Sequence, residues 1–279
     1  MWQHNINQLN KTAETTPMSD CLVIIPTYNE KENIQAIIDA VLTQDADFHI
    51  LIVDDNSPDG TADLVKEKIE VYTDRLFLEE RQDKMGLGTA YIHGFRWALK
   101  RSYQYIFEMD ADFSHNPEDL KKLYRVVQTD VCDLAIGSRY VTGVNVVNWP
   151  MSRVMMSFFA SYYVRWITGL PISDATAGFK CYNRRVLETI PLEKISFMGY
   201  AFQIEMKFLA WKYGFSLAEV PIVFTDRTHG KSKMTGGIIK EAVFGVIQMK
   251  IASLFKNYRQ EMKETPTLVE ADGFYRADT

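Results

Sequence analysis

The stretch YIFEMDADFSHNP, residues 105–117, indicates both the fold and the position of a site. Its apolar first part predicts a short strand, Tyr105–Met109, that ends in two carboxylates, Asp110 and Asp112. Asn116-Pro117 then breaks the pattern, and a helical segment follows. Carboxylate oxygens at a strand end suit a hard cation such as Mg²⁺ or Mn²⁺, which keeps coordination positions open for phosphate oxygens.

The same Asp-x-Asp spacing occurs a second time, so the spacing alone does not identify a site. Asp45-Ala46-Asp47 lies between a helical pattern and a strand-like run, where we interpret it as a solvated turn. What distinguishes Asp110 and Asp112 is their position at the end of a predicted strand.

Strand-like and helix-like segments alternate from residue 21 to about residue 140. The first strand is expected to stop at Pro26, and Asn29 is expected to cap the helix that follows. This alternation predicts an α/β fold with a mainly parallel sheet and right-handed crossovers. The expected strands lie at 21–25, 49–53, 76–78, 105–109 and 133–136.

Polar clusters follow four of these strands. Because ligands bind at the carboxyl ends of parallel strands, we expect the clusters to form one site rather than four separate solvated loops. A dinucleotide site is not expected, since Tyr91 stands where the third glycine of the fingerprint begun by Gly86 and Gly88 would be. The clusters are Pro26–Glu30, Asp54-Asp55, Asp110 with Asp112, and Gly137–Tyr140.

Two largely apolar helical segments, residues 150–168 and 238–255, stand out in the second half. In the first, polar residues recur every four positions and line one narrow stripe. Such a helix either packs into the core with a polar seam or lies in a membrane interface, and the pattern favours core packing. The stripe consists of Arg153, Ser157, Ser161 and Arg165.

Between these helices a strand is expected over residues 215–224, despite Pro221. A basic loop follows over residues 225–234. It is either a solvated loop or a lid whose cations meet phosphate.

The composition is that of an ordinary globular protein: 279 residues, 47% hydrophobic, with a net charge of −5. This charge gives no general basic footprint for nucleic acid. The three cysteines are far apart and have no metal-ligand spacing, which is typical of reduced structural thiols in the cytosol. No run approaches the ~20 apolar residues of a spanning helix.

Several motifs, in order from about residue 21 to 250, resemble those of family 2 glycosyltransferases, which have the GT-A fold, and more narrowly those of the dolichyl- or polyprenyl-phosphate mannose synthases. The resemblance implies a Rossmann-like, mainly parallel sheet with helices on both faces, followed by C-terminal amphipathic interface helices. The motifs are 23–30 (VIIPTYNE), 53–61 (VDDNSPDGT), 86–91, 108–117, 137–140, 199–206, 219–222 and 230–234.

The resemblance also implies a reaction, the inverting transfer of mannose from GDP-mannose to dolichyl or polyprenyl phosphate, assisted by Mg²⁺ or Mn²⁺. Asp112 and Arg139 are the candidate catalytic residues, with Asp112 as a metal ligand. A phosphate acceptor is already anionic, so no general base is nominated. The implied donor-binding residues are Pro26, Tyr28, Glu30, Val53, Asp55, Asp110, Ala111, Asp112, Arg227 and Lys233. The implied acceptor-phosphate residues are Arg139, Arg153 and Ser157, and the implied metal ligands are Asp110, Asp112 and Ser114.

Many bacterial relatives have transmembrane helices after the catalytic domain, and this sequence shows none. We therefore expect a protein that lies peripherally on the cytoplasmic face of a membrane, through residues 150–168 and 238–255 or a membrane-anchoring partner. The expected organisation is a loose tail (1–20), a GT-A catalytic domain (21–235) with nucleotide and acceptor halves at about 21–112 and 113–235, an amphipathic interface helix (236–257) and a loose tail (258–279).

Three other functions remain open at this point. The same fold can transfer glucose from UDP-glucose to a polyprenyl phosphate. The Asp110-x-Asp112-x-Ser114 spacing resembles the nucleophile motif of haloacid dehalogenase phosphatases, although that motif normally follows the first strand. A non-catalytic nucleotide sensor would bind nucleotide and metal without forming a lipid-linked product.

Overall fold

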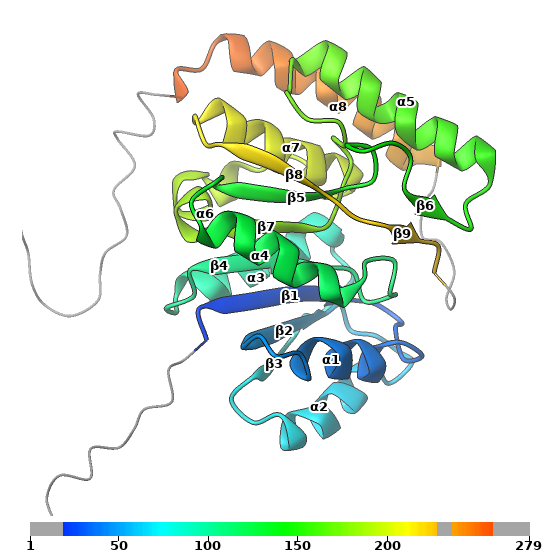
Figure 1. Cartoon of the computed structure of the whole chain (residues 1–279), viewed down its shortest axis with the longest axis vertical. Coiled ribbons are helices and arrows are strands. Elements are labelled where there is room, and N and C mark those ends of the chain that lie inside the picture. Colours follow the sequence, from blue (N-terminus) through cyan, green and yellow to red (C-terminus); the bar gives the residue numbers. More distant parts are fainter. Residues whose placement is uncertain (1–18, 228–235, 259–279) are drawn as a thin grey trace, which may run out of the picture.

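A mainly parallel sheet forms the centre of the molecule, as the sequence predicts. The structure, a computed structural model, describes residues 19–227 and 236–258, without the side chains of residues 200 and 236–242. Its sheet strands are β1 (Cys21–Thr27), β2 (Phe48–Asp54), β3 (Leu76–Glu80), β4 (Tyr105–Glu108), β5 (Leu134–Ser138), β7 (Lys180–Asn183) and β8 (Leu217–Pro221). Within the described residues the seven strands have the order β3-β2-β1-β4-β7-β5-β8 (Figure 1). All neighbours are parallel except β7, which runs antiparallel to both β4 and β5.

Helices cover both faces of the sheet. They are α1 (Ile34–Leu42), α2 (Thr61–Val71), α3 (Leu87–Leu99), α4 (Leu120–Gln128), α5 (Met151–Thr168), α6 (Arg184–Thr189), α7 (Tyr200–Lys212) and α8 (Gly236–Leu254). Helices α3, α6 and α7 contribute to one hydrophobic core, and α1, α2 and α4 contribute to the other. Strand β1 serves both, because Leu22 and Ile24 point into the first core while Val23 and Ile25 point into the second.

Strand β1 continues through Pro26, where the sequence predicted its end. The carbonyl of Ile24 accepts a hydrogen bond from the Met109 N–H at 3.2 Å, so the polar groups of Ile24 point toward β4. Pro26, two residues on, faces the same side, but the pairing with β4 ends at Ile24. The missing N–H of Pro26 therefore interrupts no hydrogen bond of the sheet.

The predicted cap at Asn29 is wrong, because α1 begins five residues later. Asn29 has a positive φ of 57°, which starts no helix. The loop before α2 binds three successive N–H groups, those of Asn29, Glu30 and Lys31, through side-chain oxygens of Ser57, Thr61 and Asp59. These bonds join the ends of β1 and β2 into one rigid edge.

The predicted strand over residues 215–224 divides in two. Strand β8 stops at Pro221, and β9 (Phe224–Thr225) leaves the main sheet to pair with β6 (Val146–Val147). This small second sheet connects the segment before α5 with the residues that precede the basic loop. Residues 228–235 of that loop, the tail before residue 19 and the tail after residue 258 lie outside the described residues.

The preference for core packing of residues 150–168 is also wrong. Only Ser161, Val164 and Thr168 of α5 are buried, so part of the polar stripe faces the protein and most of the apolar side chains face outward. Helix α8 lies beside α5 (Figure 1), where the hydroxyl of Tyr163 donates a hydrogen bond to the carbonyl of Val243 at 3.0 Å. Among the described helices, none has both the length and the apolar character needed to cross a membrane.

Candidate active site

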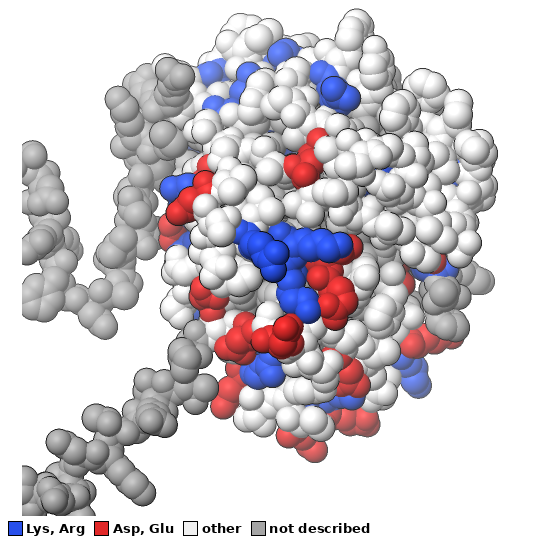
Figure 2. Space-filling model, in the orientation of Figure 1, with Lys and Arg blue, Asp and Glu red and all other residues white. Residues whose placement is uncertain are grey.

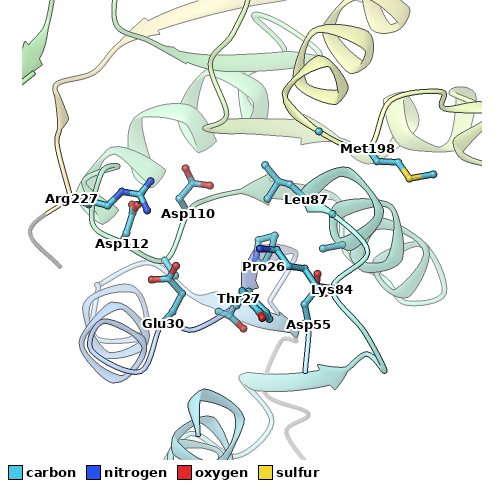
Figure 3. A pocket seen from close by; sticks show the side chains of 15 residues that line it. Pro26, Thr27, Glu30, Asp55, Lys84, Leu87, Asp110, Asp112, Met198 and Arg227 are labelled. Carbon is cyan, nitrogen blue, oxygen red and sulfur yellow. The ribbon is translucent and has the colours of Figure 1, made fainter. Parts of the chain in front are cut away.

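Two adjoining cavities open at the carboxyl edge of the sheet. The larger has a volume of about 370 Å³ and lies among the ends of β1, β2 and β4 (Figure 3). The smaller has a volume of about 60 Å³ and lies next to it, toward β5 and α5. Three residues, Leu87, Asp110 and Arg227, line both cavities, so a group in one is adjacent to a group in the other.

The end of β4 places three carboxylates at alternating positions, Glu108, Asp110 and Asp112. Glu108 is fully buried and pairs with the equally buried Lys180 of β7 at 3.0 Å. Asp112 pairs with Arg227 at 3.3 Å and also accepts the Ser114 N–H at 3.1 Å. In the part of the chain that the structure describes, no lysine or arginine lies within 4.0 Å of the Asp110 carboxylate.

Asp110 is consequently the carboxylate with the weakest charge compensation of the three. Burial and the charge of Asp112 raise the pKa of Asp110 to about 7, although Arg227 opposes the shift. Its side chain is nevertheless 40% exposed and lines the larger cavity. A divalent cation would replace the proton and relieve the repulsion, so Asp110 and Asp112 fit the first two positions of an oxygen-ligated metal.

The ring of His115 packs against the segment after β4 that carries Asp110. It is buried, stacks on Phe179 with the centroids 4.9 Å apart, and accepts the Asp110 N–H on Nδ1 at 3.3 Å. Burial lowers the pKa of His115 to about 4, so the ring is neutral and its Nδ1 is able to accept. The described residues contain no group of three or more histidine, cysteine or acidic side chains that could by themselves hold a metal ion. A metal here would take its remaining ligands from phosphate or water.

The far end of the larger cavity carries aromatic and acidic side chains from β1 and β2. The Lys84 ammonium lies 4.2 Å from the centre of the Tyr28 ring. Asp55 pairs with Arg81 at 2.5 Å, and both side chains are only 8% exposed. Burial raises the pKa of Asp55 even though Arg81 acts in the opposite direction. Figure 3 shows Glu30 and Asp55 on separate sides of the cavity.

Three arginines line the smaller cavity, each paired with a carboxylate. Arg139 is bound to Asp174 at 2.6 Å, and Arg153 to Asp226 at 2.8 Å. Arg227, with its partner Asp112, completes the set. Aromatic rings surround two of the guanidinium groups: Arg153 lies 4.1 Å from the centre of the Trp149 ring, and Arg139 lies near Tyr140, Trp149 and Phe224. This arrangement is suited to an anion.

The structure brings most of the sequence-predicted donor residues together. Val53 does not line either cavity, since its side chain is fully buried in the core, and Lys233 lies outside the described residues. The larger cavity contains Pro26, Tyr28, Glu30, Asp55, Asp110, Ala111, Asp112 and Arg227.

Of the predicted acceptor-phosphate residues, Arg139 and Arg153 line the smaller cavity and Ser157 does not. Ser157 lies one turn further along α5 than Arg153. Ser114, a predicted metal ligand, is 3% exposed and faces the smaller cavity rather than the larger.

Several lining residues were not predicted from the sequence. Met198 and Gly199 reach the larger cavity from the segment before α7, and the Met198 carbonyl accepts the Gly88 N–H at 2.8 Å. Thr176 and Trp149 contribute to the smaller cavity. Gly199 belongs to one of the quoted motifs, which is a signal that could have found it; Trp149, Thr176 and Met198 stand in no motif.

The model of the family "Glycosyl transferase family 2" matches residues 22–190. A polyprenol monophosphomannose synthase from Mycolicibacterium smegmatis is 48% identical, and the match covers 86% of this chain and 90% of that protein. An undecaprenyl-phosphate mannosyltransferase from Micrococcus luteus is 43% identical, with 86% and 98% covered.

Solved structures resemble the chain in fold. A glucosyl-3-phosphoglycerate synthase from Mycobacterium tuberculosis, in complex with Mn²⁺, UDP and phosphoglyceric acid, has a TM-score of 0.58 at 15% identity, and the match covers 85% of this chain and 79% of that one. A mannosyltransferase from Pyrobaculum calidifontis, in complex with GDP-Man and Mn²⁺, has a TM-score of 0.52 at 15% identity, with 90% and 74% covered. The sheet order and these neighbours together confirm the GT-A fold.

Asp110→Asn should stabilise the metal-free protein at neutral and alkaline pH. A carboxyl whose pKa is higher in the folded than in the unfolded chain makes folding less favourable as the pH rises from about 4 to about 7. The variant lacks this penalty. We therefore expect its melting temperature, measured with a chelator, to exceed that of the wild type at pH 8, with a smaller difference at pH 5.

Added Mn²⁺ should raise the melting temperature of the wild type at pH 8 and leave the variant almost unchanged. Asp45→Asn is the matched control in the other Asp-x-Asp, because a hydrogen bond from Lys121 lowers the pKa of Asp45 and its loss gives no gain at pH 8. A metal-free Asp110→Asn protein that melts below the wild type at pH 8 would contradict the charge argument.

Proposed function

Because the chain belongs to glycosyltransferase family 2, we propose that this glycosyltransferase moves mannose from GDP-mannose to a polyprenyl phosphate. Two relatives, 48% and 43% identical and matched over most of their length, are named for mannosyl transfer or synthesis with polyprenol or undecaprenyl phosphate. The observation that carries the proposal is the pair of adjoining cavities that share Asp110 and Arg227. A diphosphate donor and a phosphate acceptor must meet at such a junction.

The larger cavity suits the donor. Tyr28 and Asp55 offer a ring face and a carboxylate to the nucleoside, and Asp110 and Asp112 lie at the end where the diphosphate would be held. A divalent ion held by Asp110 and Asp112, when bound, would neutralise charge on the leaving diphosphate. Arg227 supplies a cation of the chain itself at the same place, since it already contacts Asp112.

The smaller cavity suits the acceptor phosphate. Arg139 and Arg153 would hold the phosphate by charge-assisted hydrogen bonds and orient one oxygen toward the sugar. That oxygen forms a new bond to C1 of mannose while the bond from C1 to the diphosphate oxygen breaks, and the electron pair of that bond leaves with GDP. One displacement of this kind inverts the configuration at C1.

No side chain is assigned as a general base. The attacking oxygen is already anionic near neutral pH, so the reaction needs positioning and charge compensation rather than removal of a proton. His115 is the histidine next to the site, and it is committed to the Asp110 N–H and stacked on Phe179.

The outer surfaces of α5 and α8 suit the lipid portion of the acceptor. Helix α5 supplies Arg153 to the smaller cavity, and its outward side chains include Phe159 at 56% and Trp166 at 74% exposure. The surface over α5 is almost free of charge in Figure 2. We call the following exposed side chains the α5–α8 apolar surface: Met151, Met155, Met156, Phe158, Phe159, Tyr162 and Trp166, with Phe244, Ile247, Ile251, Leu254 and Phe255.

This surface supports peripheral attachment to a membrane whose lipid phosphates the site would take up. Aromatic side chains with polar tips are favoured at membrane interfaces, and α5 contributes Tyr162 and Trp166. A prenyl chain that leaves the smaller cavity along α5 would remain on apolar side chains.

Transfer of label from GDP-mannose to a short polyprenyl phosphate, with Mn²⁺, tests the proposed reaction. We expect a lipid-extractable mannosyl product from the wild type and at least about a hundredfold loss with Asp112→Ala. Asp47→Ala, in the exposed second Asp-x-Asp, is the matched control and should remain active. Turnover with UDP-glucose but not with GDP-mannose would assign the enzyme to the glucosyl alternative instead.

Arg153→Ala should weaken the acceptor more than the donor. Loss of a charge-assisted contact predicts a rise of about tenfold or more in KM for polyprenyl phosphate, with KM for GDP-mannose nearly unchanged. The measurement is steady-state kinetics in detergent micelles. Arg165→Ala removes the same charge from the exposed part of α5 and should change neither constant. A rise in KM for GDP-mannose alone would instead assign Arg153 to donor binding.

Phe159→Ser combined with Trp166→Ser should reduce binding to liposomes. Together these changes remove two exposed aromatic rings of the α5–α8 apolar surface while leaving the core intact. We expect at least about a fivefold drop in the bound fraction in a sedimentation assay. Val71→Ser with Val131→Ser, which alters exposed side chains elsewhere, is the control. Equal binding by both double variants would exclude this surface as the attachment site.

A further inference from the structure

We propose that Asp174 and Glu219 are positioning residues for the acceptor phosphate, acting in series through Arg139. Neither residue lines either cavity. The inference rests on the proposed function, because it needs Arg139 to hold that phosphate.

Asp174 fixes Arg139 at several points at once. Its carboxylate accepts the Arg139 N–H at 3.0 Å, the Nε–H at 2.7 Å and an Nη2–H at 2.6 Å. Nη2 also donates to the Thr176 hydroxyl at 2.7 Å. Both the main chain and the fork of Arg139 are therefore held by one side chain, which leaves the guanidinium no freedom to rotate about its long axis.

Glu219, on β8, holds Asp174 in turn. Its two carboxylate oxygens accept the N–H groups of Ser173 and Asp174 at 2.6 and 2.8 Å. These bonds fasten the loop before β7 to β8, which pairs with β5, the strand that leads into Arg139. The series Glu219, Asp174 and Arg139 thus connects the edge strand of the sheet to the wall of the smaller cavity.

The arginine of the series is more buried than the other two arginines of the site. The side chains of Arg139 and Asp174 are 9% and 0% exposed, whereas those of Arg153 and Asp226 are 26% and 27% exposed, and Arg227 is 25% exposed. Burial alone would raise the pKa of Asp174, but the charge and hydrogen bonds of Arg139 outweigh it, so the pKa lies below its usual value and Asp174 is ionised. Arg139 is therefore held in one orientation at the wall of the cavity. Arg153 is paired with the partly exposed Asp226, which a phosphate can displace.

Asp174→Asn tests the series most directly. An asparagine keeps the shape but replaces one acceptor oxygen by an N–H donor facing Arg139, so the guanidinium loses its fixed orientation. We expect KM for polyprenyl phosphate to rise about 10–100-fold, the effect of one charge-assisted hydrogen bond, while KM for GDP-mannose changes less than about threefold. Glu219→Gln acts one step further away and should give a smaller shift in the same direction.

Asp133→Asn is the matched control. Asp133 is a buried carboxylate near the other end of β5, where it accepts the Ser216 N–H at 2.8 Å and the Arg185 Nε–H at 2.6 Å. Its loss should lower the melting temperature about as much as the loss of Asp174 does, without a selective change in either KM. If Asp174→Asn fails to fold, the same comparison is made between Glu219→Gln and Asp133→Asn.

A double-mutant cycle separates positioning from general stabilisation. In an Arg139→Lys background, which lacks the fork that Asp174 holds, Asp174→Asn should raise KM for polyprenyl phosphate by less than about twofold. The proposal would be overturned if Asp174→Asn raised KM for polyprenyl phosphate equally in both backgrounds. It would also be overturned if the substitution raised KM for GDP-mannose as much as KM for polyprenyl phosphate. If the proposed function is wrong instead, the wild type itself forms no lipid-linked mannosyl product. This result distinguishes an error in the function from an error in the positioning role.

Discussion

The compensation of negative charge at the end of β4 is the constraint on which the site depends. Glu108, Asp110 and Asp112 alternate along one strand end, and three neighbouring carboxylates cannot all remain ionised without cations. Antiparallel β7 supplies Lys180 to the first, and the segment after β9 supplies Arg227 to the third. The middle carboxylate, Asp110, keeps a raised pKa and a position on both cavities, which makes it the natural place for a divalent ion.

The same principle organises the smaller cavity, the proposed acceptor site. Each arginine of the smaller cavity is paired with a carboxylate, but the carboxylates differ in burial. The ion pairs therefore differ in how readily a substrate can break them. Asp174 is completely buried and orients Arg139, whereas Asp226 is partly solvated and adjacent in sequence to Arg227. The proposed site for two anionic substrates would use both kinds of pair. The cation of the buried pair gives orientation, and the cation of the partly exposed pair is available to a substrate.

Local patterns predicted the alternation of strands and helices, and the strand ends then predicted that Pro26–Glu30, Asp55, Asp110 and Arg139 would meet at one edge. What depends on long-range contacts could not be predicted. Asn29 does not cap α1, because the loop at 57–61 binds the local N–H groups. The apolar side chains of α5 face outward, since the sheet was already covered by other helices. Asp174 and Glu219 act on Arg139 across loops that no spacing in the sequence relates.

In the proposed reaction, donor and acceptor react across the shared wall of two cavities in one displacement, with no covalent intermediate on the protein. The configuration at C1 of the transferred mannose tests this most directly, and the one-bond carbon–hydrogen coupling at that carbon in the purified lipid product reports it. From an α-linked GDP-mannose, a single displacement gives a β-linked mannosyl phosphate. An α-linked product would contradict it, because retention requires two displacements or attack from the side on which the diphosphate leaves.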